Sequence, residues 1–249
     1  MFDLECNTKL HTQTLAAICP EANSYEQLMA FCRKLRLPES DCIEVFRRMV
    51  FNVLANNTDD HNKNFSFIMS QDGKWRLSPA YDITYIIDRG GFLPNEDHCL
   101  YIRGKFREIT RDDILQFAKN NGIRRPDAII KDVADSLKKF RPIASRYGVN
   151  KQWIGRVETT IINHLMAWGE IEAPTISTAK EINGHKMSNI RLEQTYKGNY
   201  HLYADIDGME HKYIIGKNKE EYQLIEKNGI IGISDEQLTL MAVRLFRLQ

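Results

Sequence analysis

The chain has 249 residues, 43% of them hydrophobic, and its 34 basic residues nearly balance its 33 acidic ones. This near-neutral charge argues against a strongly basic nucleic-acid or membrane-surface protein, and the length suits one large domain with a smaller one. The five cysteines form no C-x-x-C pair, and neither a signal sequence nor an apolar run of about 18 residues is present, so we expect a soluble cytoplasmic protein with no membrane partner.

Three helices are predicted first along the chain. Residues 8–18 and 24–35 contain apolar side chains at helical spacing, and Ser24 is a suitable N-cap for the second segment. A third helix is expected over about 41–56, where Ile43, Phe46 and Val50 form part of an apolar stripe. It should end at Asn56-Asn57-Thr58, because these side chains favour turns.

A β-hairpin is predicted immediately afterwards. The apolar runs FSFIM and WRL flank an Asp-Gly turn signal at Asp72-Gly73, and Ser78-Pro79-Ala80 ends the second run. Such a hairpin would return the chain so that Asp82 lies beside Asp59 and Asn64.

The spacing of Asp59, Asn64 and Asp82 is typical of protein kinases. These enzymes use one Asp to accept the substrate hydroxyl proton, an Asn to hold Mg²⁺, and a second Asp to hold Mg²⁺ from beyond a short hairpin. A lone D-x-x-x-x-N would be read as a cap or turn. The hairpin followed by Tyr81-Asp82-Ile83 instead favours a kinase-derived site.

The stretches TDDHNKNFSF and LSPAYDI resemble the catalytic core of the HipA-type serine/threonine kinases, the toxins of bacterial toxin–antitoxin modules. HTQTLAA, HCLYIRGK and ITRDDILQFAKNNGI extend the likeness over roughly residues 8–169. The resemblance implies phosphoryl transfer from Mg-ATP to a protein Ser or Thr, with an aminoacyl-tRNA synthetase as the suggested substrate. It also implies an antitoxin partner, through which any contact with DNA would be indirect.

Carried over by position, the resemblance assigns a role to each residue of the motif. Asp59 is the expected catalytic base, and Asn64 and Asp82 are the expected magnesium ligands. His61 and Lys63 are expected to steady the γ-phosphate as further catalytic residues. Asp60 is expected to be a solvated turn residue without a role.

A hydrolytic metal site is the rival chemistry. Asp59, Asp60 and His61 are all types that bind divalent ions, and His98 or His11 is a candidate to join them. However, the chain contains no H-E-x-x-H or similar spacing. We otherwise expect His98 to be a surface or hairpin residue.

The upstream part of a kinase is missing from the sequence. A Gly-rich phosphate-covering loop is required, yet the first glycine is Gly73. Three explanations stay open: a fragment or truncated product, one half of a split kinase with a separate N-lobe partner, or a catalytically incomplete, pseudokinase-like interaction module. We expect little or no kinase activity from this chain alone.

The large lobe should continue to residue 169. Residues 83–109 occupy the place of an activation segment, with 98–106 a strand or extended segment. Thr110 and Asp113 form a capping pattern for a helix stopped by Gly122. Two more helical stretches follow, the first interrupted near Pro142 and the second carrying Trp153, Ile161, Leu165 and Trp168 on one face.

Residues 170–176 are expected to be a linker before a small domain over 177–249. Alternating patterns predict three strands at 189–196, 200–206 and 209–216, then helices over 218–229 and from Ser234 to Leu248. Tyr200, Tyr203 and Tyr213 should pack on a strand face. The fold class is therefore α+β: a mainly helical kinase-like lobe, then a β-meander with two helices that serves interaction, dimerisation or packing.

Overall fold

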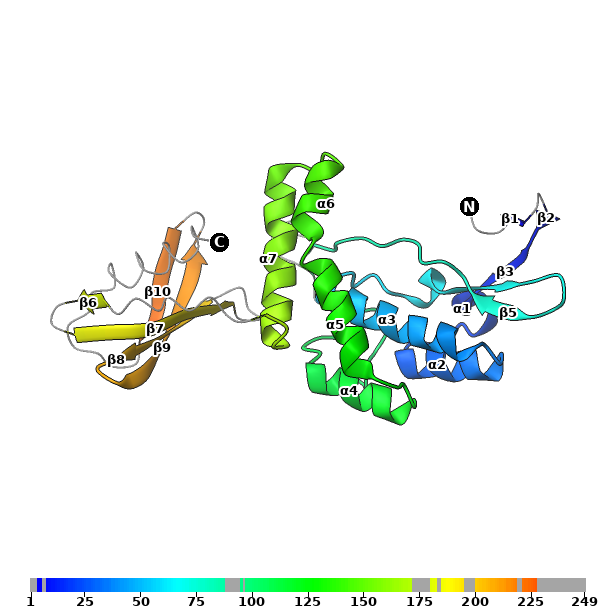
Figure 1. Ribbon diagram of the computed structural model, residues 1–249, viewed down its shortest axis with the longest axis horizontal. Helices are drawn as coiled ribbons and strands as arrows, with labels where there is room; N and C mark the ends of the chain where they lie inside the picture. Colours follow the sequence, from blue (N-terminus) through cyan, green and yellow to red (C-terminus); the bar gives the residue numbers. More distant parts are fainter. Residues whose placement is uncertain are drawn as a thin grey trace. The chain divides into compact units, whose positions relative to one another are not determined.

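The computed structural model describes residues 4–5, 8–87, 95, 97–171, 180–182, 185–194, 200–218 and 221–227. The chain divides into two compact units, residues 1–170 and 171–249. This division falls beside the linker expected at 170–176. Among the described residues, the first unit contains helices and short strands and the second an antiparallel sheet (Figure 1), so the protein is of the α+β class.

The first unit is built around one long helix, α3, which contacts α2, α5 and α7. In Figure 1, α3 lies between α2 and α5. Its side chains Phe46 and Val50 are fully buried, as the apolar stripe predicts, whereas Ile43 of that stripe is only half-buried. Met49 is fully buried as well. The helices are α1 (Leu15–Ile18), α2 (Tyr25–Lys34), α3 (Glu39–Ala55), α4 (Arg111–Asn120), α5 (Pro126–Leu137), α6 (Phe140–Arg146) and α7 (Lys151–Ala167), with a 3₁₀ turn, η1, at Asn62–Asn64.

Several expected helix ends are confirmed. The Ser24 hydroxyl accepts a hydrogen bond from the Gln27 N–H at 3.3 Å and so caps α2. Helix α3 ends at Asn56, which adopts the left-handed conformation with φ of 58°. Thr110 and Asp113 form a reciprocal capping box at α4. The predicted interruption near Pro142 is the break between α5 and α6.

The expected inner face of α7 is confirmed only in part. Ile161, Leu165 and Trp168 are buried, whereas Trp153 is 43% exposed. Trp153 lies in the first turn of the helix, where its ring is covered by the Arg156 guanidinium at 5.1 Å instead of by a neighbouring helix.

The predicted hairpin is confirmed, and it belongs to a three-stranded antiparallel sheet of order β3-β4-β5. Its strands are β3 (His11–Thr14), β4 (Ser66–Met69) and β5 (Trp75–Leu77). The helix expected over 8–18 is wrong, because only Leu15–Ile18 is helical, after β2 (Thr8–Lys9) and β3; β2 pairs with β1 (Leu4–Glu5). Strand β3 pairs with β4, and its β-branched Thr12 and Thr14 suit that conformation.

An ion pair between a buried Asp41 and a half-exposed Arg76 fixes the hairpin to α3. Asp41, 5% exposed, accepts two hydrogen bonds of 2.8 Å from Arg76 on β5 and one of 2.9 Å from the Leu77 N–H. The Arg48 guanidinium, also on α3, donates to the Ser78 carbonyl at 2.7 Å. The strand leading toward Asp82 is therefore held by two side chains of one helix.

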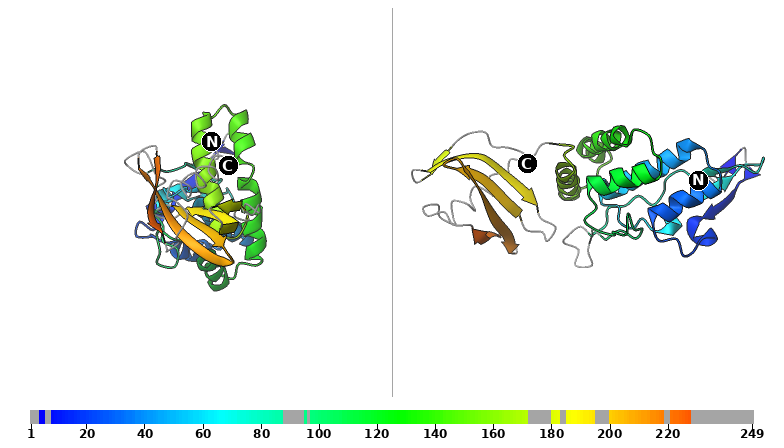
Figure 2. Two further views of the ribbon diagram at one scale, coloured as in Figure 1. Left: turned by 90° about the vertical axis from the view of Figure 1, so that its left-hand side faces the viewer. Right: turned by 90° about the horizontal axis from the view of Figure 1, so that it is seen from below.

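The second unit is a five-stranded antiparallel sheet of order β10-β9-β8-β7-β6 (Figure 2). The strands are β6 (Lys180–Ile182), β7 (His185–Gln194), β8 (Tyr200–Ile206), β9 (Met209–Asn218) and β10 (Glu221–Lys227). The meander is confirmed, including the turn at Asp207-Gly208, whose φ angles are 51° and 88°.

Two expectations for this unit have other outcomes. The helix expected over 218–229 is wrong, because Glu221–Lys227 forms β10 against β9. Pairing to an existing strand edge outweighs the helical propensity of its Glu and Lys residues. The last expected helix, from Ser234, lies outside the described residues. Tyr213 is buried and Tyr203 half-buried, as strand-face packing predicts.

In the described part of the chain, no helix combines the length and the apolar character that crossing a bilayer demands.

Candidate active site

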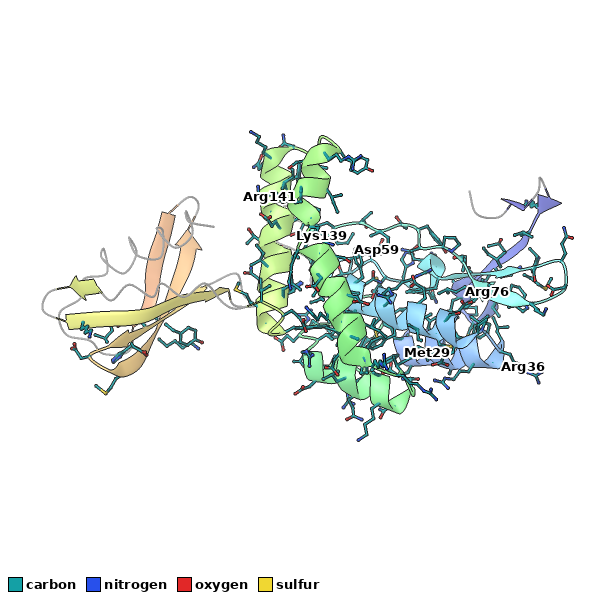
Figure 3. The ribbon with its side chains drawn as sticks, viewed as in Figure 1. Met29, Arg36, Asp59, Arg76, Lys139 and Arg141 are labelled. Carbon is teal, nitrogen blue, oxygen red and sulfur yellow. The ribbon has the colours of Figure 1, made fainter. Side chains whose placement is uncertain are left out.

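The loop after α3 brings three of the expected site residues together. Asp59 lies in this loop (Figure 3), with its side chain 47% exposed. The Asn64 side-chain amide donates a hydrogen bond of 2.8 Å to the Asp59 carbonyl. His61 Nε2 lies 3.7 Å from Asp59 Oδ1. The η1 turn at Asn62–Asn64 makes the hydrogen bond between Asn64 and Asp59 possible, because it folds residue 64 back toward residue 59.

Tyr81 ties Asp82 to the same loop. Its hydroxyl donates to the Lys63 carbonyl at 2.6 Å and interacts with the Ser66 hydroxyl at 2.5 Å. Partial burial raises the pKa of the Tyr81 phenol, which keeps it a proton donor at neutral pH. Tyr81, which precedes Asp82, is thus hydrogen-bonded to Lys63, which precedes Asn64. In the sequence, Tyr81 stood out only as the neighbour of Asp82. Its hydrogen bond to the loop was not predicted.

Asp82 has an unusual backbone. Its φ of 54° is in the left-handed region, which is uncommon for residues other than glycine, and its side chain is exposed. Asn64, Tyr81 and Ile83 contribute to the wall of one small recess, so Asn64 and the two residues flanking Asp82 border the same space. The recess is also lined by Arg48, Asn52, Asn57, Asp60, Phe65 and Ala80.

The oxygens needed for a magnesium site are available here. Because the Asn64 Nδ2 is committed to the Asp59 carbonyl, its Oδ1 points away from that bond. Among the described residues, nothing donates a hydrogen bond to the Asn64 Oδ1 or forms an ion pair with the Asp82 carboxylate. Amide and carboxylate oxygens are the hard ligands that Mg²⁺ prefers. The donor chemistry of these two side chains is therefore of the kind that suits the ion.

The rival hydrolytic metal site finds no support in the described ranges. No group of three His, Cys, Asp or Glu side chains there is arranged to hold a metal ion. His11 lies on β3 against the Trp75 ring at 5.6 Å. Asp60 and His98 contact each other, but both are buried and already hydrogen-bonded.

The expectation for Asp60 is wrong. Asp60 is 1% exposed, and its carboxylate accepts bonds from the Tyr25 hydroxyl at 2.7 Å and from the backbone N–H groups of Cys99 and Leu100 at 2.9 and 3.3 Å. His98 Nδ1 lies 2.9 Å from the same carboxylate, so the expectation of a surface His98, which is 7% exposed, is also wrong. A buried carboxylate requires such partners.

The polar network continues into α3 and beyond Asp82. The Asn52 amide donates to the Tyr25 hydroxyl at 2.9 Å, and the Asn57 amide donates to Asn52 Oδ1 at 2.9 Å. The Thr84 N–H donates to Asn57 Oδ1 at 3.1 Å. Burial, reinforced by the Asp60 charge, raises the pKa of Tyr25 far above its ordinary value. The network therefore links the two sides of the candidate site.

Cys99 contacts the expected base from the opposite direction. Its N–H lies 3.1 Å from the Thr58 carbonyl as well as bonding Asp60, and its Sγ is 3.8 Å from Asp59 Oδ1. Burial, and then the charges of Asp60 and Asp59, raises the pKa of the Cys99 thiol to about 11. The later part of the expected activation segment is thereby held against the loop that carries Asp59.

Comparison with known proteins places these features in a family. The family model "HipA-like C-terminal domain" matches residues 2–140. "Putative kinase Y4dM" of Sinorhizobium fredii is 26% identical over 145 residues, which are 57% of this chain and 32% of that protein. "Putative kinase" of Haemophilus influenzae is 26% identical over 141 residues, 50% of this chain and 40% of that protein.

A solved structure of the HipA, HipB and operator DNA complex from Shewanella oneidensis has a TM-score of 0.49 and 18% identity, covering 59% of this chain and 36% of that one. The chain spans well under half the length of the curated relatives it matches. The family match covers more than half of the present sequence and includes the loop with Asp59 and Asn64, the hairpin and Asp82. The chain therefore belongs to the HipA-like C-terminal domain family.

Proposed function

We propose that this chain carries the catalytic loop and the magnesium ligands of a HipA-like serine/threonine protein kinase. The supporting observation is the joining of Asp59 to Asn64 by a 2.8 Å hydrogen bond, together with the attachment of the Asp82 segment through Tyr81. Family membership and relatives named as kinases support the same chemistry. A protein hydroxyl would be the acceptor, and Mg-ATP the donor.

Each side chain has a role in this proposal. The half-exposed Asp59 carboxylate accepts the proton of the substrate hydroxyl. Asn64 and Asp82 hold Mg²⁺, which supplies charge neutralisation for the phosphates. The Lys63 ammonium forms no ion pair with another described residue, so it is available to the γ-phosphate, and His61 is placed to assist beside Asp59.

We propose that the loop that covers the ATP phosphates comes from outside the present sequence. Residues 1–72 contain no glycine, whereas kinases cover the phosphates with a Gly-rich loop. A separate N-lobe polypeptide, or the remainder of a longer protein, would supply it. Because catalysis of this kind is positioning and electrostatics, we propose weak or no turnover by the chain alone. An antitoxin partner and an aminoacyl-tRNA synthetase substrate are further proposals that rest on the family.

Calorimetry and phosphoryl transfer together test the proposal. Mg-ATP is titrated into the chain alone and into the chain mixed with each candidate N-lobe protein, and transfer of labelled γ-phosphate is then measured. Binding and transfer that require the second protein, and transfer that Asp59→Asn abolishes, are the expected results. Asp132→Asn, at a carboxylate 67% exposed on α5, is the matched control. Mg-ATP binding without transfer in any mixture would instead identify a catalytically incomplete interaction module.

A further inference from the structure

The loop over residues 98–106 is held by backbone hydrogen bonds beside the candidate base. The His98 N–H donates to the Phe106 carbonyl at 2.7 Å, and Ile102 pairs with Lys105 through a turn at Arg103 and Gly104, whose φ angles are 53° and 76°. The buried Asp60 carboxylate holds the start of the loop through the Cys99 and Leu100 N–H groups. Of the two expectations for this segment, a strand or an extended segment, the strand is wrong, because only isolated bridges form.

A second attachment fixes the middle of the loop to the start of α2. The Tyr101 N–H donates to the Asn23 carbonyl at 2.8 Å, and the Tyr25 N–H donates to the Tyr101 carbonyl at 3.0 Å. The backbone of the loop is therefore bonded on both sides. Side chains that it presents to solvent have a fixed position relative to Asp59.

Two of those side chains are aromatic. Tyr101 and Phe106 are 37% and 36% exposed, and their rings meet edge to face with centroids 5.7 Å apart. The Arg107 guanidinium covers Phe106 at 4.8 Å. The cations of the loop have carboxylate partners: Lys105 bonds Asp113 at 2.8 Å, Arg103 lies 3.6 Å from Asp113, and Arg107 bonds Asp97 at 2.7 Å.

We propose that Tyr101 and Phe106 form a docking surface for an apolar side chain of the protein substrate. This inference rests on the proposed kinase function and names the kind of substrate segment that the site takes. Exposed, preordered aromatic rings contribute large contact area at low entropic cost. Since the neighbouring charges are already paired, the surface favours an apolar residue over an acidic one. A nucleic-acid strand would require free cations beside the rings.

The position of the rings sets where the apolar residue lies in the substrate. Cys99 Sγ is 3.8 Å from the Asp59 carboxylate, and Tyr101 follows two residues later, so its Cα is at most about 7 Å from that of Cys99. An extended substrate advances about 3.3 Å per residue. The apolar side chain therefore belongs roughly two to four residues from the accepting hydroxyl.

Fluorescence polarisation with short peptides tests this on the full chain. The probes are labelled 11-residue peptides with a central Ser, terminal Lys residues for solubility and otherwise Gly and Ala, with one Phe or Leu moved through each position from −4 to +4. We expect Phe or Leu two to four residues from Ser, on one side, to tighten binding roughly five- to tenfold over the Ala peptide.

Variants decide whether the rings cause that preference. Tyr101→Ala and Phe106→Ala should reduce the best peptide to the affinity of the Ala peptide, whereas Tyr101→Phe should keep the preference because the ring remains. Tyr147→Ala, at an aromatic residue 78% exposed beyond α6, is the matched control and should change nothing. Thermal unfolding of each variant shows whether it is folded.

Two outcomes overturn the proposal: no position of Phe or Leu improves binding, or Tyr101→Ala and Phe106→Ala proteins that stay folded keep the preference. Tighter binding of a labelled oligonucleotide than of any peptide also contradicts it. Asp59→Asn should leave peptide docking unchanged while abolishing transfer. An apolar preference in the peptide assay, with no transfer in any mixture with a candidate N-lobe protein, would contradict the proposed kinase function and leave the docking surface intact.

Discussion

The Tyr81 hydroxyl and the Lys63 carbonyl are joined by a hydrogen bond of 2.6 Å across a separation of 18 residues. This bond connects the end of the hairpin to the catalytic loop at the position next to Asn64. It ties together two separate stretches of sequence, each of which carries one of the proposed magnesium ligands. The Ser66 hydroxyl, at 2.5 Å, completes the arrangement.

Tyr81→Phe should separate the two stretches while keeping the ring packed. We expect a loss of about 1 kcal/mol in the free energy of unfolding, because two partly buried polar partners lose one hydrogen bond each. Urea denaturation measures this loss. Tyr147→Phe removes a hydroxyl from a residue 78% exposed and should change stability by less than about 0.5 kcal/mol. Equal effects of the two variants would show that the Tyr81 bond does not hold the loop.

Removing the carboxylates of the adjacent residues Asp59 and Asp60 should have very different effects on the free energy of unfolding. Asp60→Ala leaves the Tyr25 hydroxyl and the Cys99 and Leu100 N–H groups without their buried acceptor, so we expect a loss of roughly 3–5 kcal/mol. Asp59→Ala removes a half-exposed side chain and should cost less than about 1 kcal/mol. Chemical denaturation of both proteins gives the comparison. A stable Asp60→Ala protein would contradict the buried network.

The pair Asp59 and Asp60 also shows what the sequence allows one to predict. The spacing of Asp59, Asn64 and Asp82 is local information, and the α3 stripe, the hairpin and the capping box follow from periodicity and turn chemistry. The burial of Asp60 depends on Tyr25, 35 residues earlier, and on the backbone at Cys99, 39 residues later. No local pattern records contacts at such separations.

The wrong secondary-structure predictions have the same cause. Residues 11–14 and 221–227 were expected to be helical from their local composition, yet each pairs with a neighbouring strand. Pairing with β4 or β9 supplies hydrogen bonds that a helix prediction from single-sequence propensity does not weigh. The signal available in advance was weak: Thr12 and Thr14 alternate along the chain as strand residues do.

Acid should weaken the link between α3 and the hairpin. Burial alone would raise the pKa of Asp41, but hydrogen bonds from Arg76 and the Leu77 N–H outweigh it and lower the pKa below its ordinary value. A carboxyl with a lowered folded-state pKa stabilises the protein above its unfolded-state value, about 3.9, and loses that contribution as pH falls through the folded-state value.

The pH dependence of Asp41→Asn therefore distinguishes this carboxylate from the rest. We expect the variant to be about 1–3 kcal/mol less stable than the natural protein at pH 7, with the gap closing below about pH 4. Thermal and urea unfolding between pH 3 and 7 measure it. Asp132→Asn, 67% exposed, should follow the natural protein throughout. A gap that stays constant across this range would show that the ionised form of Asp41 is not what holds Arg76.

Alkylation of Cys99 reports the contact between this thiol and Asp59. Burial and the charges of Asp60 and Asp59 raise the pKa of Cys99 to about 11, so little thiolate exists near pH 8 although the residue is exposed. In a Cys6→Ser, Cys19→Ser background, where Cys32 and Cys42 are buried, the rate with iodoacetamide should rise about tenfold per pH unit from 8 to 10. Asp59→Asn removes one raising charge and should speed the reaction severalfold at pH 8, while Asp132→Asn should not. Mass spectrometry of the Cys99 peptide over time gives these rates, and identical rates with and without the Asp59 carboxylate would place the thiol away from the candidate base.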